Sequence, residues 1–246
     1  MVKKIIQTAF LLIFLLSAGG APLAAAAPGA TADRRPVLTL EASAGSSGLK
    51  QALNKTKLGW PWYVTRASGL VAAALLVILI IFGIGLITGY TYKLMEPVSA
   101  WAVHRALGIA LGVSILIHVL VLLFDKYTPF SILQVLVPFT SHYRPAIIWG
   151  VHLGSLYVAF GVLAFYAAAI VIVSSLVWVD KKPLTWRLLH YTGYLLAVLV
   201  FLHGLYLGTD LKQGFFRVLW LAGGIAIIVG IIFRLRRART INIDEQ

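Results

Sequence analysis

Five long apolar runs constrain the fold of this chain more than any other feature of its sequence. A transmembrane helix needs about 20 predominantly apolar residues to cross a hydrocarbon layer of about 30 Å. Apolar residues make up 60% of the chain and charged residues only 12%, which leaves too few charges to cover the surface of a water-soluble globule. We therefore predict an all-α, polytopic transmembrane helical bundle with five core spans, near residues 63–88, 101–124, 146–178, 187–208 and 216–234.

The spans and their flanks divide the chain into four regions. Residues 1–27 have the basic start, short apolar run and small-residue end of a signal peptide, or of an uncleaved signal anchor. Residues 28–60 are rich in Ala, Gly and Ser without helical periodicity, so we expect a flexible extracytoplasmic tail. The transmembrane domain then covers residues 61–234, and a basic cytoplasmic tail covers residues 235–246.

Two apolar segments do not fit a simple helix crossing. The third run, residues 146–178, is longer than a span needs, so we expect it to tilt or to project from the membrane. Residues 129–139 are apolar, too short to cross and bounded by proline, which is typical of an interfacial or re-entrant segment.

The chain carries a formal net charge of +13, from 21 Lys and Arg against 8 Asp and Glu. In a soluble protein this excess would suggest a nucleic-acid partner. Here the basic residues flank apolar spans, where they fix topology and contact anionic lipid, and the arginine cluster at residues 234–239 belongs in the cytoplasm. We therefore expect a multi-pass protein of the cell membrane, in contact with membrane lipid and no nucleic acid, with its mature N-terminus outside and its C-terminus in the cytoplasm.

Four of the six histidines lie in the second and fourth spans, which run parallel to each other. His104 and His118 are fourteen residues apart, and His190 and His203 are thirteen apart. Each pair extends over roughly 20 Å of helix, so each span carries one histidine near the inner interface and one near the outer interface. Imidazole at both axial positions suits a b-type haem and needs no cysteine, of which the chain has none. The pattern predicts two haem b groups with these four histidines as iron ligands.

The spacing in the fourth span does not suit a continuous helix. Thirteen residues at about 100° each place His203 roughly 140° away from His190, whereas fourteen residues bring His118 back to within roughly 40° of His104. We therefore expect a π-bulge, local unwinding or asymmetric side-chain rotamers in the fourth span.

Other residues near the spans are weaker candidates for the same sites. Arg66 and Arg144 fall near the outer level, where a guanidinium can bind a haem propionate in a bidentate fork, although snorkelling toward the interface explains them equally well. His152, near the outer start of the third span, is expected to pack at the interface or to touch an outer cofactor. His142 lies in the outer loop and is expected to be solvated.

The acidic residues argue against a carboxylate-based proton pump or ion-coupled transporter. None of the eight Asp and Glu residues lies deep inside a span, where such a protein needs them. A lone membrane histidine also serves in hydrogen bonding between helices. Two alternatives therefore stay open: a small permease or ion-pathway protein with histidine-lined polar sites and no haem, and a structural membrane scaffold with no cofactor.

Residues 60–210 resemble the ferric reductase-like transmembrane domain family, which includes the membrane halves of NADPH oxidases, iron reductases and the haem subunit of bacterial methionine sulfoxide reductase systems. The segments that carry the resemblance are WYVTRASGLV (62–71), HRALGIALGVSILIHVLVLLFD (104–125), VPFTSHYRP (137–145) and WRLLHYTGYLLAVLVFLHGLYLGTD (186–210). The resemblance implies that His104 pairs with His190 at one haem and that His118 pairs with His203 at the other.

The resemblance also implies a function in electron transfer across the membrane, through two bis-histidine haems to an acceptor on the outer side. Oxidases and iron reductases of the family carry cytoplasmic flavin and nicotinamide domains. Here only a short basic tail follows the fifth span, and no Gly-rich dinucleotide fingerprint is present. We therefore expect an oxidoreductase subunit that takes electrons on the inner side from another protein, a quinone or a diffusible flavin.

Overall fold

The computed structural model describes residues 44–126, 128–144, 146–148 and 150–244. The elements in chain order are α2 (Ala44–Thr88), the 3₁₀ turn η1 (Thr91–Lys93), α3 (Pro97–Leu122), α4 (Ile132–Leu136), β1 (Ile147–Ile148), β2 (Val151–His152), α5 (Gly154–Val177), α6 (Pro183–His190), α7 (Thr192–Leu207) and α8 (Gly214–Asp244). The signal segment expected at residues 1–27, and residues 28–43 of the expected tail, lie outside the described residues.

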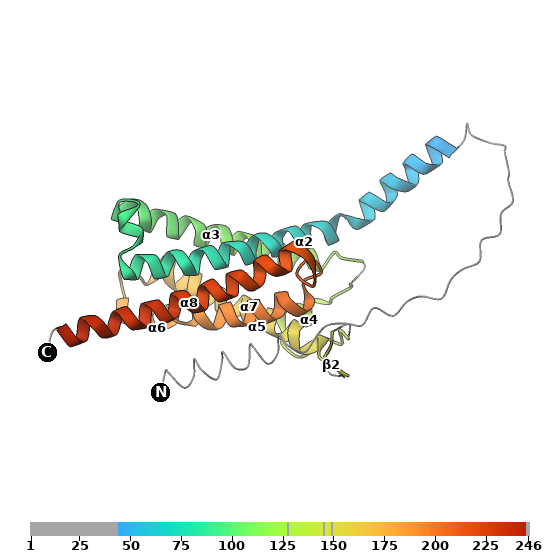
Figure 1. Cartoon of the computed structure of the whole chain (residues 1–246). Coiled ribbons are helices and arrows are strands. Elements are labelled where there is room, and N and C mark those ends of the chain that lie inside the picture. The colour runs from blue at the N-terminus through green and yellow to red at the C-terminus, as the bar shows by residue number, and fades with distance from the viewer. Residues whose placement is uncertain (1–43, 127, 145, 149, 245–246) are drawn as a thin grey trace.

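Within the described part of the chain, five helical stretches are long and apolar enough to cross a membrane, which confirms the predicted number of spans. They are Gly59–Thr88, Pro97–Leu122, Gly154–Val177, Pro183–Leu207 and Gly214–Arg237. The long helices run side by side in Figure 1. The protein is therefore a polytopic, multi-pass helical membrane protein.

The second half of the segment expected as a tail, residues 44–60, is helical. α2 begins at Ala44 and is continuous with the first span. Ala, Leu, Lys and Gln favour a helix, and no proline interrupts this stretch before Pro61. In Figure 1 the start of α2 extends well beyond the rest of the bundle.

The third span is shorter than the apolar run that predicted it. Residues 146–153 do not extend the helix but contain the small hairpin of β1 and β2, in which Ile147 lies opposite His152, and α5 begins only at Gly154. Gly150 adopts a φ of 78°, a left-handed conformation that glycine takes without strain. The run therefore folds back instead of tilting as one long helix.

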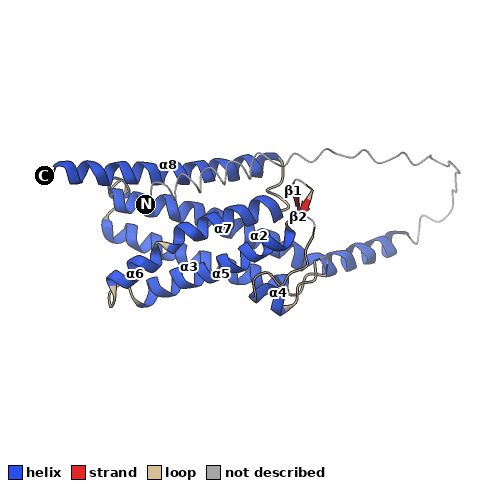
Figure 2. Ribbon diagram, turned by 90° about the horizontal axis from the view of Figure 1, so that it is seen from below, coloured by secondary structure: helices blue, strands red, loops and turns tan. Residues whose placement is uncertain are grey.

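Residues 129–139 do not cross the bundle, in agreement with their length. They contain the five-residue helix α4, whose start is fixed by reciprocal hydrogen bonds between Ser131 and Gln134. Figure 2 shows α4, β1 and β2 at the same end of the bundle. We call this the loop end, defined by residues 123–153. The opposite end, where residues 89–96 lie, is the tail end.

Four of the spans form a closed ring. α3 packs along α2, α2 packs against α7, α7 packs along α5, and α5 packs against α3, whereas α3 and α7 are diagonal partners without extensive contact. Small residues of α5 let the helices approach closely, which favours van der Waals packing in a membrane. The interior midway along the ring is filled by Leu76, Leu79, Leu111, Ala164, Ala167, Ala168, Leu196 and Leu199. α8 packs outside this ring, against α2 and α7.

The fourth span consists of two helices. α6 ends at His190 and α7 begins at Thr192, with Tyr191 between them. The Thr192 hydroxyl donates to the carbonyl of Leu189 at 2.6 Å, and the amide of Tyr194 donates to the carbonyl of Tyr191 at 3.1 Å. This interruption corresponds to local unwinding, one of the three deviations that the thirteen-residue spacing allows, and it follows the first of the two histidines directly.

Candidate functional site

Two histidine pairs bridge the ring at different depths. At the tail end, His104 of α3 faces His190 of α6, with ring centres 6.2 Å apart and ring planes at 55°. At the loop end, His118 of α3 faces His203 of α7, with ring centres 6.5 Å apart and planes at 88°. We call these the tail-end pair and the loop-end pair. The structure thus brings together the same partners that the family resemblance implies.

The loop-end pair is anchored by backbone carbonyl groups of the two other ring helices. Nδ1 of His118 donates to the carbonyl of Thr65 in α2 at 2.8 Å, and Nδ1 of His203 donates to the carbonyl of Tyr157 in α5 at 2.8 Å. A carbonyl can only accept, so Nδ1 carries the proton in both rings. The neutral imidazole then leaves Nε2 as a lone-pair donor for a ligand.

A glycine makes each of these anchors possible. Gly69 and Gly161 lie four residues after Thr65 and Tyr157, on the same helix faces. A Cβ added to Gly69 would lie 3.0 Å from the His118 ring, and one added to Gly161 would lie 2.6 Å from the His203 ring. Any side chain there would separate the imidazole from the carbonyl it binds. α2 and α5 therefore share one local arrangement, in which a carbonyl that accepts from a histidine is followed one turn later by a glycine.

The tail-end pair has weaker polar anchors and more aromatic ones. Nδ1 of His190 lies 3.2 Å from the Ser175 hydroxyl, whereas Nδ1 of His104 is buried without a hydrogen-bond partner among the described residues. The ring of Phe82 stacks on His104 with centres 6.2 Å apart, and the ring of Trp186 lies 5.3 Å from that of His190. Packing against aromatic rings therefore holds this pair in place.

A cavity of about 290 Å³ adjoins the loop-end pair. It is lined by both histidines, by apolar residues of the ring helices, and by Asp125, Phe130 and Tyr143 from the loop end. The cavity therefore leads from the loop-end pair toward the loops at that end of the bundle.

Arg66 lines the same cavity and forms the bidentate fork predicted for it, but with a carboxylate of the protein. Its Nε donates to Oδ2 of Asp210 at 2.8 Å, and its second nitrogen pairs with Oδ1. The guanidinium also lies over the Trp62 ring, with Cζ 4.0 Å from the ring centre. The ion pair ties α2 to the loop between α7 and α8. Propionate binding by Arg66 stays a prediction and requires that Asp210 share or release the guanidinium.

The remaining candidates from the loop end lie away from the histidine pairs. Arg144 and His152 are exposed, and neither lines the cavity; Nδ1 of His152 donates to the Arg144 carbonyl at 3.1 Å. His142 is also exposed, as expected. The structure therefore does not bring these three residues to the pairs.

Comparison with known families matches residues 68–201 to the ferric reductase like transmembrane component family. The chain belongs to this family. Neither the comparison with curated proteins nor that with solved structures finds a match. Membership assigns the ferric reductase-like domain a role in electron transfer at a membrane, and members of the family generally bind haem.

The ring separation in each histidine pair suits two ligands on opposite sides of one haem iron. A bond from an imidazole nitrogen to a metal is about 2 Å long and the nitrogen lies about 1.1 Å from the ring centre, so two imidazoles on opposite sides of one metal have ring centres about 6 Å apart. Both observed separations are close to this value. Among the described residues no cluster of three or more His, Cys, Asp or Glu could hold a metal ion. Two protein ligands are few for such an ion but sufficient where a porphyrin supplies the rest.

Space beside the tail-end pair supports the same fit. A Cβ added to Gly108 of α3 or Gly193 of α7 would meet no atom within 4 Å. These glycines lie four residues after His104 and three after His190, so both are close to the pair in the chain. No atom of the described residues therefore covers the backbone at these two positions.

Several residues that contact the tail-end pair or the helix break beside it were not indicated by any sequence pattern. Arg234 of α8, interpreted as a topology signal, donates to the hydroxyl groups of Tyr191 and Tyr194, beside the helix break that follows His190. Ser175 contacts His190 from α5. Each of these contacts joins residues at least 15 positions apart, so no local spacing could have predicted it.

The pairing of Arg66 with Asp210 makes stability depend on pH. The guanidinium holds the pKa of Asp210 below its ordinary value. The ion pair therefore contributes above the unfolded pKa of about 3.9 and is lost as the pH falls through the folded value. We expect Asp210→Asn to lower the free energy of unfolding at pH 7 by about 1.5–3 kcal/mol, the range for hydrogen bonds to charged groups. Thermal unfolding in detergent at pH 7 and at about pH 3 would measure the loss.

Asp180→Asn is the matched control, because Asp180 is exposed in the turn between α5 and α6. The two variants should differ at pH 7 and converge with the wild type in acid. An equal deficit of Asp210→Asn at both pH values would contradict the charge-based account.

Proposed function

We propose that this protein carries electrons across the membrane through two haem b groups, one held by each histidine pair. The observation that carries the proposal is the spacing of the pairs, with ring centres 6.2 Å and 6.5 Å apart at two depths of one helical ring. Helix α3 supplies one ligand to each haem. The second ligand comes from α6 at the tail end and from α7 at the loop end. Two imidazoles on a haem iron give a low-spin centre that exchanges single electrons and has no open position for a substrate.

The protein's contribution is to orient the imidazoles and to exclude water. The carbonyl groups of Thr65 and Tyr157 fix the loop-end rings in the tautomer that presents Nε2, and such outer partners also raise the basicity of the ligand. Between the two pairs, the leucines and alanines of the ring core provide no polar group that could carry a proton. We therefore expect electrons, but not protons, to pass between the two levels of the ring.

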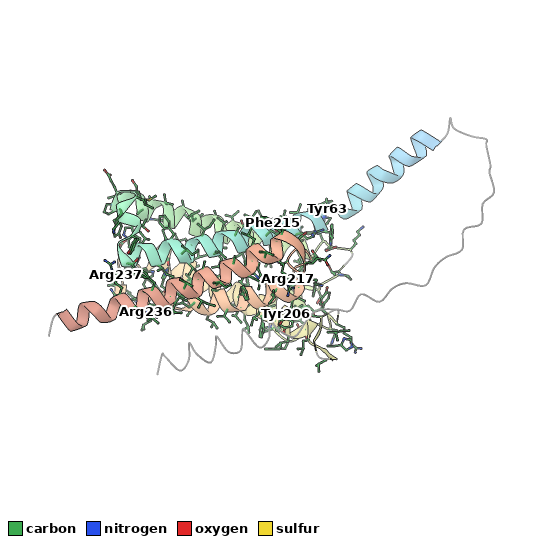
Figure 3. The ribbon with its side chains drawn as sticks, in the orientation of Figure 1. Tyr63, Tyr206, Phe215, Arg217, Arg236 and Arg237 are labelled. Carbon is green, nitrogen blue, oxygen red and sulfur yellow. The ribbon has the colours of Figure 1, made fainter. Side chains whose placement is uncertain are left out.

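We further propose that the tail end is cytoplasmic and that electrons move from the tail-end pair to the loop-end pair. Arg234, Arg236 and Arg237 lie at the tail end, where the positive-inside rule favours the cytoplasm. Figure 3 shows Arg236 and Arg237 at the end of the bundle opposite to Tyr63, Phe215 and Arg217. The donor is then a protein, quinone or flavin on the inner side, and the acceptor meets the cavity at the loop end. In this role the chain acts as the electron-transfer subunit of an oxidoreductase.

Histidine substitutions test the pairing. His118→Ala and His203→Ala should each reduce the haem content from two to one per chain, because each removes one axial bond of the loop-end group. Combining them should cost little more, since both residues act on one cofactor. His118→Ala with His190→Ala removes one ligand from each pair and should abolish the bis-imidazole spectrum. Haem per polypeptide and low-temperature visible spectra would measure these effects.

His152→Ala is the control, because His152 is exposed and away from both pairs. It should retain two haems. Retention of one six-coordinate haem by the His118→Ala, His190→Ala double variant would mean that the ligands are paired in some other way.

Gly161→Ala tests whether the glycine beside the loop-end pair is required. The added methyl group would stand 2.6 Å from the His203 ring and push it off the Tyr157 carbonyl. We expect loss of the loop-end haem, or a clear shift of its midpoint potential, with the tail-end haem retained. Gly223→Ala is the control, since its Cβ would make an ordinary contact of 3.4 Å with Val77. Wild-type potentials for both haems in Gly161→Ala would exclude this role of the glycine.

Sidedness is tested with reporters fused after Gln246. If the tail end is cytoplasmic, a reporter that is active only in the cytoplasm should work there, and one that is active only outside should not. The reverse result would invert every span and exchange the donor and acceptor sides.

A further inference from the structure

The two histidine pairs differ in what their Nδ1 atoms contact. Both Nδ1 atoms of the loop-end pair donate to backbone carbonyl groups at 2.8 Å. In the tail-end pair, Nδ1 of His190 has only the Ser175 hydroxyl, at 3.2 Å, and Nδ1 of His104 has no partner among the described residues. The chain therefore holds the two pairs by different means, although both pairs have nearly the same ring separation.

Ser175 is itself fixed by a second contact. Nε1 of Trp186 lies 3.1 Å from the Ser175 hydroxyl oxygen, and an indole nitrogen can only donate. The serine oxygen has a second lone pair, which lies within reach of a proton on Nδ1 of His190. Trp186 and His190 are one turn apart on α6, whereas Ser175 belongs to α5, so the three side chains tie the two helices together.

The anchor lies beside the helix break. His190 is the last residue of α6, and the chain turns at Tyr191 before α7 begins. Its backbone is therefore less constrained than that of His203, which lies well inside α7. A side-chain hydrogen bond from α5 can restrict the rotation that the break would otherwise allow.

We propose that Ser175, held by Trp186, is the positioning residue of the tail-end pair, and that it makes this site differ in redox potential from the loop-end site. The inference rests on the proposed haem function. By accepting a hydrogen bond from Nδ1–H of His190, Ser175 selects the tautomer in which Nε2 is directed to the ligand position. A hydroxyl oxygen shared with Trp186 is a weaker acceptor than a carbonyl group, so it raises the basicity of the imidazole less. Taken by itself, this contribution raises the midpoint potential of the tail-end site, so onward transfer to the loop-end site needs an acceptor that withdraws the electron on the outer side.

The test compares two adjacent serines of α5. Ser175→Ala removes the acceptor and should raise the midpoint potential of the tail-end haem, because a less basic imidazole stabilises ferric iron less. The loop-end potential should not change. Ser174→Ala is the matched control, since the Ser174 hydroxyl is buried and donates to the Val171 carbonyl of its own helix at 3.2 Å. It should leave both potentials unchanged. Spectroelectrochemical titration of the purified, haem-loaded full chain measures both potentials.

Ferric electron paramagnetic resonance gives a second readout, because the anisotropy of a bis-imidazole haem depends on the angle between its ring planes. The planes stand at 55° in the tail-end pair and at 88° in the loop-end pair, so two distinct signals are expected. The tail-end signal is identified as the one that survives in His203→Ala. Ser175→Ala should change or broaden this signal alone. Ser175→Thr, which keeps the hydroxyl, should restore both the signal and the potential.

Trp186→Phe separates the hydrogen bond from ring packing. It keeps an aromatic ring beside His190 but removes the N–H that fixes Ser175, so we expect a smaller shift in the same direction. It also provides the test if Ser175→Ala does not fold. Wild-type potentials and signals in either variant, with two haems bound, would overturn the positioning role. A shift of the loop-end haem alone would overturn it too, whereas a wild-type chain that binds no haem would refute the proposed function itself.

Discussion

The helices that carry the candidate ligands do not pack extensively against each other, and histidine rings bridge the distance between them. α3 and α7 are diagonal members of the ring, separated by α2 on one side and α5 on the other. The imidazoles of α3 meet one imidazole of α6 and one of α7 in the interior, at the separation that two ligands of one metal require. The apolar core lies between the two pairs, so each pair occupies its own level.

The low polarity of a membrane interior explains how the rings are held. An unpaired N–H is costly where no water is available, and the helix carbonyls are the nearest acceptors. A carbonyl inside a helix is normally covered by the residue one turn later. At the loop end that residue is glycine in both supporting helices, Gly69 after Thr65 and Gly161 after Tyr157. The tail-end pair uses a serine and aromatic rings instead, which gives the two levels different surroundings.

Much of the fold, and the two levels at which the histidines lie, could be predicted from local spacing, whereas the pairing of the histidines came from the family resemblance. Apolar runs indicate spans because length and hydropathy are local properties. The thirteen-residue interval also indicated a π-bulge, local unwinding or asymmetric rotamers in the fourth span, but not which of these occurs or that the helix break lies at Tyr191. The hairpin at residues 147–152 could not be predicted, since its residues are as apolar as the helix that follows.

The environment of the candidate site was less predictable, because its contacts join distant parts of the chain. Arg66 was predicted to hold a haem propionate in a bidentate fork. In the structure its fork holds Asp210, which lies 144 positions away in the chain. The acceptors for His118 and His203 are backbone atoms, which no residue type reveals. Arg234 was interpreted by its charge alone, and its contact with two tyrosines depends on how α8 packs.

The most direct test of the account is the reduced-minus-oxidised visible spectrum of the wild-type protein, purified after expression with ample haem, together with its haem content. Two bis-histidine sites predict two haem b groups per chain and the sharp absorption bands of six-coordinate, low-spin haem on reduction. A folded but colourless protein would contradict the account, and the histidine pairs would then be polar contacts between helices.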